Sequence, residues 1–299
     1  MSTQAKVVRV VVTSGLVLAV LHPAVAGDVK LLGQPGKFPI VITVPGSYRL
    51  KSNLTVPDAN TSAIDVEAND VALDLNGYVI SGPVTCTGTP VTSCTPSGSG
   101  FGIVHLNPSF GNNVRVTNGT VRGMGDDGIR LADAAHVERV TVTNNGNNGI
   151  VASTNATIID CTALSNGNSG IAAANSSTMT RNHAEGNKGA GINASFDTIV
   201  SENTVWANAV GISSLDGTVV QNNTARGNAN YGIGASGTST VNGNTAQGNT
   251  GFGLLLAGAV PPGYWGNIVN FNNGGNANPQ VSGGTQIGTN ICGGDTVCP

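Results

Sequence analysis

Four side chains in the middle of the chain carry groups that could bind or modify a sugar. His183 and Glu185 are separated by one residue, and Trp206 and Arg226 follow Glu185 at successive intervals of 21 and 20 residues. Histidine and glutamate can exchange protons with a substrate, a tryptophan offers a flat surface for sugar stacking, and arginine can hold a carboxylate through two hydrogen bonds. These residues predict a polysaccharide-binding patch, and the alternative is a polar surface that carries one tryptophan.

A second candidate site consists of Asp126, Asp127 and Arg130. Adjacent carboxylates could bind Ca²⁺ or act as an acid and a base. The alternative is structural, because turns favour aspartate beside glycine. The sequence predicts no cofactor, and Ca²⁺ at this pair is the one alternative to that expectation.

A repeat of 20 or 21 residues determines how these side chains are positioned. Short runs of alternating polarity predict strands, and Asn/Gly clusters between the runs predict turns. Three short strands and three turns fit into about 21 residues, after which the chain returns above its own start. The repeat is marked by a glycine followed by an apolar residue, at Gly128-Ile129, Gly149-Ile150, Gly170-Ile171, Gly191-Ile192, Gly211-Ile212, Gly232-Ile233 and Gly253-Leu254.

The predicted fold is all-β: a right-handed, single-stranded parallel β-helix, a solenoid with about 21 residues per coil. The handedness follows from the strong right-handed preference of parallel crossover connections. A leucine-rich repeat has a similar period but needs several leucines per repeat. Only Leu164 and Leu215 occur between Val137 and Val241, which excludes that fold.

The repeat register also predicts which side chains point outward together. Two outward columns, two residues apart on the same strand, share one face of the solenoid. His183 and Glu185 therefore lie beside Trp206 and Arg226 across three consecutive coils. The columns are Arg122, Thr143, Leu164, Glu185, Trp206, Arg226 and Gln247, and Thr120, Thr141, Thr162, His183, Thr204, Thr224 and Thr245.

The Gly-Ile/Asn repeats and the upstream segments VALDLNGYVISG (71–82) and VRVTNGTVRG (114–123) resemble right-handed parallel β-helix repeat proteins of the pectate-lyase-like superfamily. The resemblance covers roughly residues 40–273 and implies the same fold. For function it implies a range from lyases, hydrolases and epimerases to proteins that are not enzymes. No catalytic motif of the superfamily is apparent, so the resemblance identifies no catalytic residue.

Residues 1–26 are predicted to be a signal peptide. Lys6 and Arg9 precede an apolar run, and Ala24-Val25-Ala26 has the small residues of a cleavage site. The run is short for a membrane span, although an N-terminal anchor is the alternative. The chain is therefore expected to be secreted or periplasmic, with no stable membrane insertion after cleavage. The rest divides into an N-terminal cap with the first strands (27–70), the coils (71–273) with an insertion (83–100), and a C-terminal cap (274–299).

Charge and cysteine content narrow the possible partners and the compartment. Removing residues 1–26 changes the formal charge from −3 to −5, which argues against a nucleic-acid partner because such proteins present a basic face. Cys86 with Cys94, and Cys292 with Cys298, are close pairs that predict disulfides in an exported protein. Cys161 falls in a column otherwise occupied by asparagine, which predicts a buried side chain that fills space.

The predicted function is that of an exported β-helix protein that binds or modifies a polysaccharide. An enzyme of this kind would be a polysaccharide lyase, a glycoside hydrolase or an epimerase, and the sequence leaves open whether the protein is an enzyme. The alternative is a non-catalytic solenoid with a structural, adhesive or scaffold role, since clustered charge is scarce and many outward side chains are small.

Overall fold

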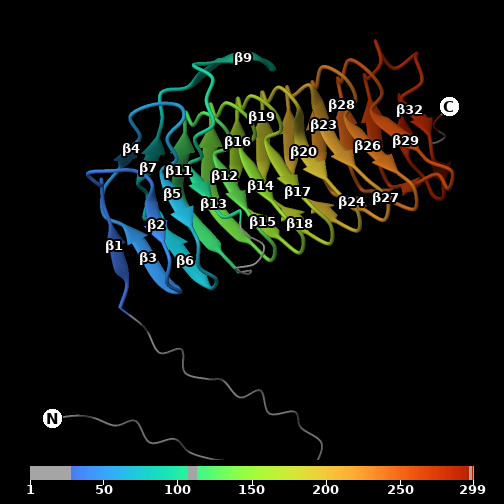
Figure 1. The fold of residues 1–299 in the computed structure, drawn as a ribbon. Coiled ribbons are helices and arrows are strands. Elements are labelled where there is room, and N and C mark those ends of the chain that lie inside the picture. The colour runs from blue at the N-terminus through green and yellow to red at the C-terminus, as the bar shows by residue number, and fades with distance from the viewer. Residues whose placement is uncertain (1–27, 107–112, 296–297, 299) are drawn as a thin grey trace, which may run out of the picture.

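The computed structural model describes residues 28–106, 113–295 and 298. The predicted signal peptide at 1–26 lies outside the described residues. From Asp28 onward the chain winds into a long solenoid of stacked coils, with its first strands at one end and its last strands at the other (Figure 1). All named elements are β-strands, and no described segment is an α-helix that could cross a membrane.

Apart from one two-stranded antiparallel hairpin, the strands form two parallel sheets that face each other across the interior. Sheet A has 21 strands and sheet B has 11. The strands of sheet A are β1 (Lys30–Leu32), β3 (Gly46–Leu50), β4 (Leu54–Thr55), β6 (Val71–Asp74), β7 (Val79–Ser81), β11 (Arg115–Arg122), β13 (His136–Thr143), β15 (Thr157–Ile159), β16 (Thr162–Leu164), β18 (Thr178–Thr180), β19 (His183–Glu185), β21 (Ile199–Ser201), β22 (Thr204–Trp206), β24 (Val219–Gln221), β25 (Thr224–Arg226), β27 (Thr240–Asn242), β28 (Thr245–Gln247), β30 (Gly263–Trp265), β31 (Ile268–Asn270), β33 (Thr285–Gln286) and β34 (Ile291–Cys292). Those of sheet B are β2 (Ile40–Ile42), β5 (Ile64–Val66), β10 (Ile103–Val104), β12 (Ile129–Leu131), β14 (Ile150–Ala152), β17 (Ile171–Ala173), β20 (Ala190–Ala194), β23 (Val210–Ser214), β26 (Ile233–Ser236), β29 (Leu254–Ala257) and β32 (Val281–Gly283).

Each regular coil contributes one strand to sheet B and two to sheet A. The two strands in sheet A meet at a residue with positive φ, such as Asp160 between β15 and β16 (54°) or Arg181 between β18 and β19 (53°). The next coil pairs in parallel one repeat later, so that Ile150 lies opposite Ile171. This arrangement is the predicted parallel β-helix.

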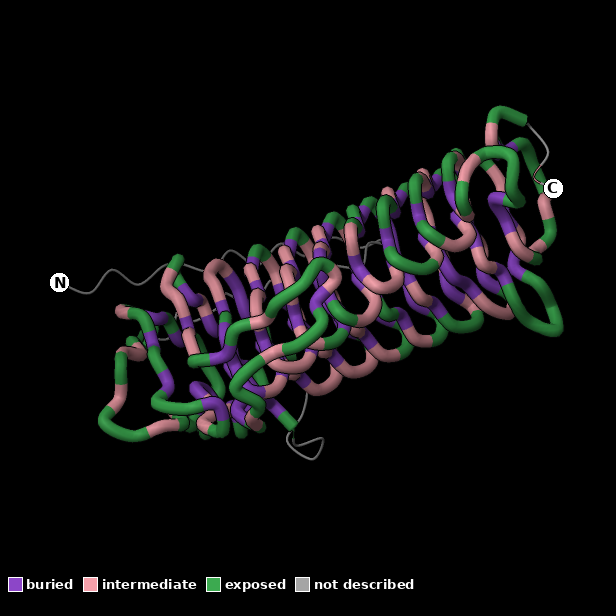
Figure 2. Tube along the Cα trace, turned by 90° about the horizontal axis from the view of Figure 1, so that it is seen from above, coloured by how far each residue is buried: buried purple, intermediate pink, exposed green. Residues whose placement is uncertain are grey.

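Stacked apolar side chains make up the interior. Ile171 lies between Ile150 and Ile192 in the register of sheet B, and all three are fully buried. Buried positions recur from coil to coil along the whole length of the solenoid (Figure 2). Because every inward position repeats, each coil buries its apolar side chains against its two neighbours.

Two ladders of buried asparagines run parallel to the apolar columns. The Oδ1 atom of Asn187 accepts hydrogen bonds from the backbone nitrogen (3.0 Å) and the Nδ2 atom (2.9 Å) of Asn166, one coil earlier. The Nδ2 atom of Asn187 in turn donates to Oδ1 of Asn208, at 2.8 Å. The ladders pair the amides of their members, and every buried side-chain nitrogen and oxygen of the described residues has a hydrogen-bond partner. Their members are Asn145, Asn166, Asn187, Asn208, Asn228, Asn249 and Asn272, and Asn182, Asn203, Asn223, Asn244, Asn267 and Asn290.

Cys161 begins the second ladder and is buried, as predicted. Its backbone nitrogen donates to Oδ1 of Asn182 at 2.9 Å, and burial raises the pKa of its thiol to about 12. Since the thiolate is the reactive form, we expect iodoacetamide to leave Cys161 unmodified in the folded protein at pH 8 and to label it in 6 M guanidinium. Peptide mass spectrometry measures the labelling. Labelling at the same rate in both conditions would contradict this placement.

The structure confirms both predicted disulfides. Cys86–Cys94 joins the two strands of an antiparallel hairpin, β8 (Thr85–Gly88) and β9 (Val91–Thr95), inside the predicted 83–100 insertion. The second disulfide joins Cys292, in the last strand β34, to Cys298. Coil stacking extends beyond the predicted 71–273 at both ends, because β1 and β3 already pair in sheet A and β32 still pairs in sheet B.

Candidate functional site

The outward face of strands β19, β22 and β25 brings together the four residues of the first predicted site. In the parallel register Glu185 lies opposite Trp206, and Trp206 lies opposite Arg226. His183 occupies the neighbouring column on the same face. We call His183, Glu185, Trp206 and Arg226 the tryptophan patch.

The histidine and the glutamate of the tryptophan patch form a pair. Nε2 of His183 lies 3.0 Å from Oε2 of Glu185, and both side chains are about one third exposed (38% and 34%). With Nε2 protonated, the imidazole donates this hydrogen bond to the carboxylate. A partly exposed imidazole held by a carboxylate can donate or accept a proton at a bound ligand.

Trp206 and Arg226 border a surface hollow. The hollow has a volume of about 330 Å³ and is lined by both of these side chains together with His183, Thr204 and Thr224. Half of the Trp206 surface is exposed. No carboxylate oxygen in the described part of the chain lies within ion-pair distance of Arg226. The hollow therefore offers an aromatic face, two hydroxyl groups and a guanidinium that is available to an anion.

The second predicted site is arranged differently from the sequence-based hypothesis. Asp127 is fully buried, and its Oδ1 accepts hydrogen bonds from the backbone nitrogen and Nδ2 of Asn148, both at 2.9 Å. Its Oδ2 accepts from Nε of Arg130, whose guanidinium also lies over the ring of Phe101. Burial raises the pKa of the Asp127 carboxyl, although the bonds from Asn148 and Arg130 oppose this shift.

Only Asp126 of the two carboxylates reaches the surface, where its Oδ1 accepts a hydrogen bond from Asn147 one coil later. The structure therefore does not bring Asp126 and Asp127 together as a solvent-facing pair. Among the residues that the structure describes, no three histidine, cysteine or acidic side chains are close enough to hold a metal ion. The geometry favours the structural alternative for this cluster, in which Asp127 links neighbouring coils.

A second histidine–glutamate pair was not predicted from the sequence. Nε2 of His136 lies 3.2 Å from Oε2 of Glu138, the same spacing of two residues as in the tryptophan patch. Here, however, Arg115 and Arg139 also form ion pairs with Glu138. Burial, followed by the two arginine charges, lowers the pKa of His136. Because its carboxylate is neutralised by two arginines, this pair is less suited to proton exchange than His183 and Glu185.

Sequence reasoning placed Thr204 and Thr224 on the correct face but did not include them in the site. Both lie in the hollow beside Trp206. The sequence feature that could have identified them is the threonine column, in which each member lies two residues before a member of the Trp206 column. A repeated threonine is also common on any outward strand position, so the pattern by itself did not distinguish these two from the others.

Comparison with known proteins supports the architecture. The family model for the right-handed β-helix region matches residues 53–205 and 101–251. The A-module of the mannuronan C-5 epimerase AlgE4 from Azotobacter vinelandii superposes with a TM-score of 0.56 at 18% identity, covering 79% of this chain and 72% of that one. A double mutant of the periplasmic alginate epimerase AlgG gives 0.57 at 14% identity, covering 86% and 74%. No curated protein matches the sequence.

Proposed function

The chain belongs to the right-handed β-helix family, and from this premise we propose that it binds a polysaccharide at the tryptophan patch. The observation that carries the proposal is the hollow beside Trp206. It is lined by an exposed indole, two threonine side chains and a guanidinium that has no ion-pair partner among the described residues. Exposed aromatic rings with nearby hydrogen-bonding groups suit sugars, which have both apolar faces and hydroxyl edges.

The preferred ligand in this proposal is an anionic polysaccharide with carboxylate groups. Arg226 can hold a carboxylate bidentately. According to their names, the two epimerases of similar fold act on mannuronan and alginate. At 18% and 14% identity, the similarity to this chain is one of fold alone. Modification of the bound chain is an extension of the same proposal, with His183 and Glu185 as the groups that would exchange protons.

We also propose that the protein works outside the cytoplasm, either secreted or in the periplasm. The two disulfides support this, because such bonds persist in oxidising compartments. The predicted signal peptide is consistent with it.

The test of binding is the replacement Trp206→Ala. We expect it to weaken binding of short alginate or polygalacturonate oligosaccharides by at least ~1 kcal/mol, a typical value for the loss of an aromatic contact. Arg226→Ala should weaken binding of these anionic sugars at low salt and have little effect at 1 M NaCl, where charges are screened. Isothermal titration calorimetry measures both effects.

Leu164→Ala is the matched control, because Leu164 lies in the same outward column two coils from Trp206 and outside the hollow. Its affinity for a short oligosaccharide should equal that of the wild type. If the wild type binds no polysaccharide, or if Trp206→Ala binds as well as the wild type, the proposal fails and a structural or adhesive role is favoured. Release of new unsaturated or reducing sugar ends by the wild type, and its loss in His183→Ala, would establish modification.

A further inference from the structure

The insertion does not project away from the solenoid but lies along one of its edges. Where the chain passes from the second strand of sheet A toward sheet B, each coil has a residue with positive φ directly after the strand. We call this line of residues the turn ridge. It borders the face that carries the tryptophan patch. Its members are Gly123, Asn144, Ser165, Gly186, Ala207, Gly227, Gly248 and Phe271.

The hairpin β8–β9 is fastened to the turn ridge over several coils. The backbone nitrogen of Val84 donates to the carbonyl oxygen of Gly123 at 2.9 Å, and that of Cys86 donates to Oδ1 of Asn144 at 3.2 Å. Near the tip, the nitrogen of Val91 donates to the carbonyl oxygen of Gly186 at 2.9 Å. The hairpin thus covers the ridge from the coil of Gly123 to the coil of Gly186.

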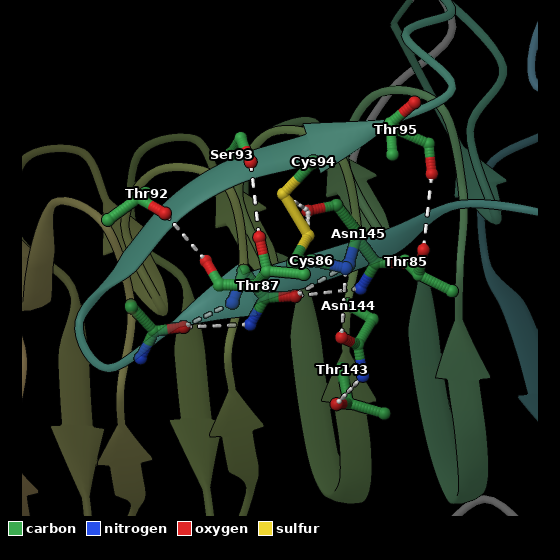
Figure 3. Close-up of a disulfide and its surroundings, with 12 residues drawn as sticks. Thr85, Cys86, Thr87, Thr92, Ser93, Cys94, Thr95, Thr143, Asn144 and Asn145 are labelled. Carbon is green, nitrogen blue, oxygen red and sulfur yellow. Dashed lines mark hydrogen bonds between the residues drawn. A yellow bond between two sulfur atoms is a disulfide. The ribbon is translucent and has the colours of Figure 1, made fainter.

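The disulfide ties the two arms of the hairpin together directly above the coils. Figure 3 shows the Cys86–Cys94 bond facing Asn145, with the two hairpin strands running above the coils. The two sulfur atoms lie 3.6 and 3.8 Å from the carbonyl oxygen of Asn145. Thr87 and Ser93 add a cross-strand hydrogen bond at 3.1 Å. The hairpin is therefore built as a fixed rim.

The indole of Trp206 continues this rim beyond the hairpin tip. A Cβ atom built on Gly227 would lie 3.1 Å from Nε1 of Trp206, so the indole extends over the ridge one coil later, where the glycine leaves room for it. At Gly186 the nearest hairpin side chain is Thr89, whose Cγ2 lies 3.8 Å from the corresponding Cβ position. Only Ala207 separates these two covered positions on the turn ridge.

We infer that the hairpin and Trp206 form one rim of a single axial groove, and that this groove takes an extended polysaccharide chain rather than one sugar unit. The floor is the threonine column, whose side chains are intermediate or exposed: Thr141, Thr162, His183, Thr204 and Thr224. The inference rests on the proposed function and assigns the hairpin a role in it, that of selecting for ligand length.

The dimensions allow length selection to be tested. Five coil steps separate Gly123 from Gly227, or roughly 24 Å at about 4.8 Å per coil. The hollow beside Trp206 occupies only the last coils of this span, and no hairpin residue lines it. A short oligosaccharide in the hollow therefore does not reach most of the hairpin, whereas a longer chain that continues toward Leu164 and Thr143 runs beside it.

The experiment compares oligosaccharides of increasing length from alginate and polygalacturonate, with affinity measured by titration calorimetry. One variant replaces residues 86–94 with two glycines, and a second, Cys86→Ser with Cys94→Ser, frees the hairpin arms but changes no coil. For the wild type we expect the dissociation constant to fall as the chain lengthens. Deletion should raise the dissociation constant for the longest oligosaccharide about tenfold. The serine variant should raise it by a smaller factor. Neither variant should change the affinity for the shortest oligosaccharide.

The double variant Cys292→Ser with Cys298→Ser is the control, because it removes the other disulfide at the far end of the solenoid. It should keep the full dependence on length. Circular dichroism confirms that each variant retains the β-structure, and the serine variant decides the question if the deletion does not fold. If the affinity of the hairpin variants rises with oligosaccharide length as much as that of the wild type, the inference is overturned and the role of Trp206 is left intact. If the wild type binds no oligosaccharide, the proposed function itself is overturned.

Discussion

Replacing Ile171 with aspartate should prevent cooperative folding or destabilise the protein by more than about 4 kcal/mol. Ile171 is fully buried between Ile150 and Ile192, and no side chain in this column can pair with a carboxylate. A carboxyl group there loses its hydration and displaces the apolar contacts of two neighbouring coils. Since the whole stability of a domain is typically ~5–15 kcal/mol, a loss of this size is readily seen in urea denaturation followed by circular dichroism.

Ala172→Asp is the matched control for this prediction. Ala172 is the next residue and points outward from sheet B, between Val151 and Asn193 in the register. A carboxylate at this position stays in water, so the expected change in the free energy of unfolding is within about 0.5 kcal/mol. Comparable damage from both substitutions would show that the inward and outward assignment of this strand is wrong.

The second large effect is expected for Asn187→Ala, which breaks the first asparagine ladder at its middle. The side chain of Asn187 accepts two hydrogen bonds from Asn166 and donates to Oδ1 of Asn208 and to the carbonyl oxygen of Ala163 (3.1 Å). Truncation removes the acceptor of the buried Asn166 backbone N–H and takes one partner each from Nδ2 of Asn166, Oδ1 of Asn208 and the carbonyl of Ala163, at about 1–3 kcal/mol for each group that finds no new partner. We expect the free energy of unfolding to fall by roughly 3 kcal/mol or more.

Two measurements make this prediction specific. Chemical denaturation gives the loss of stability, and hydrogen exchange should show reduced protection of the Asn166 amide, which loses its acceptor. Asn168→Ala is the control, because Asn168 is exposed and its side chain donates one hydrogen bond, to Asn147 at 3.2 Å. If Asn168→Ala were as damaging as Asn187→Ala, the buried ladder would not be the source of the stability assigned to it.

The regular part of the fold was predictable because each coil repeats the contacts of the previous one. A single interval, read from the spacing of Gly170-Ile171 and its equivalents, determined the strand register, the inward columns and the position of Cys161 in an asparagine ladder. Such a solenoid is held by nearest-neighbour contacts, so a local pattern contains the information needed to build it. The same register placed Trp206 beside Arg226 and Glu185.

The first coils were less predictable because their lengths vary. Lys30 pairs with Tyr48, 18 residues later, whereas Leu73 pairs with Val116, 43 residues later. The insertion lengthens the second of these coils, so the repeat cannot be seen in the spacing of residues. The stacked strands are nevertheless equivalent in space, because parallel pairing constrains the strands and leaves the connecting loops free in length.

The sequence by itself determined the β-helix, its register, its disulfide pairs and the face that carries the tryptophan patch, because all of these follow from periodicity or from short separations along the chain. Only the tertiary structure decided the contacts that depend on side-chain direction and on the path of an aperiodic segment. In the structure Asp127 is buried against Asn148, and Glu138 forms ion pairs with two arginines. The Trp206 indole extends over Gly227, and the hairpin lies along the turn ridge. No repeat constrains these features, since each joins residues whose equivalents in neighbouring coils are of a different type.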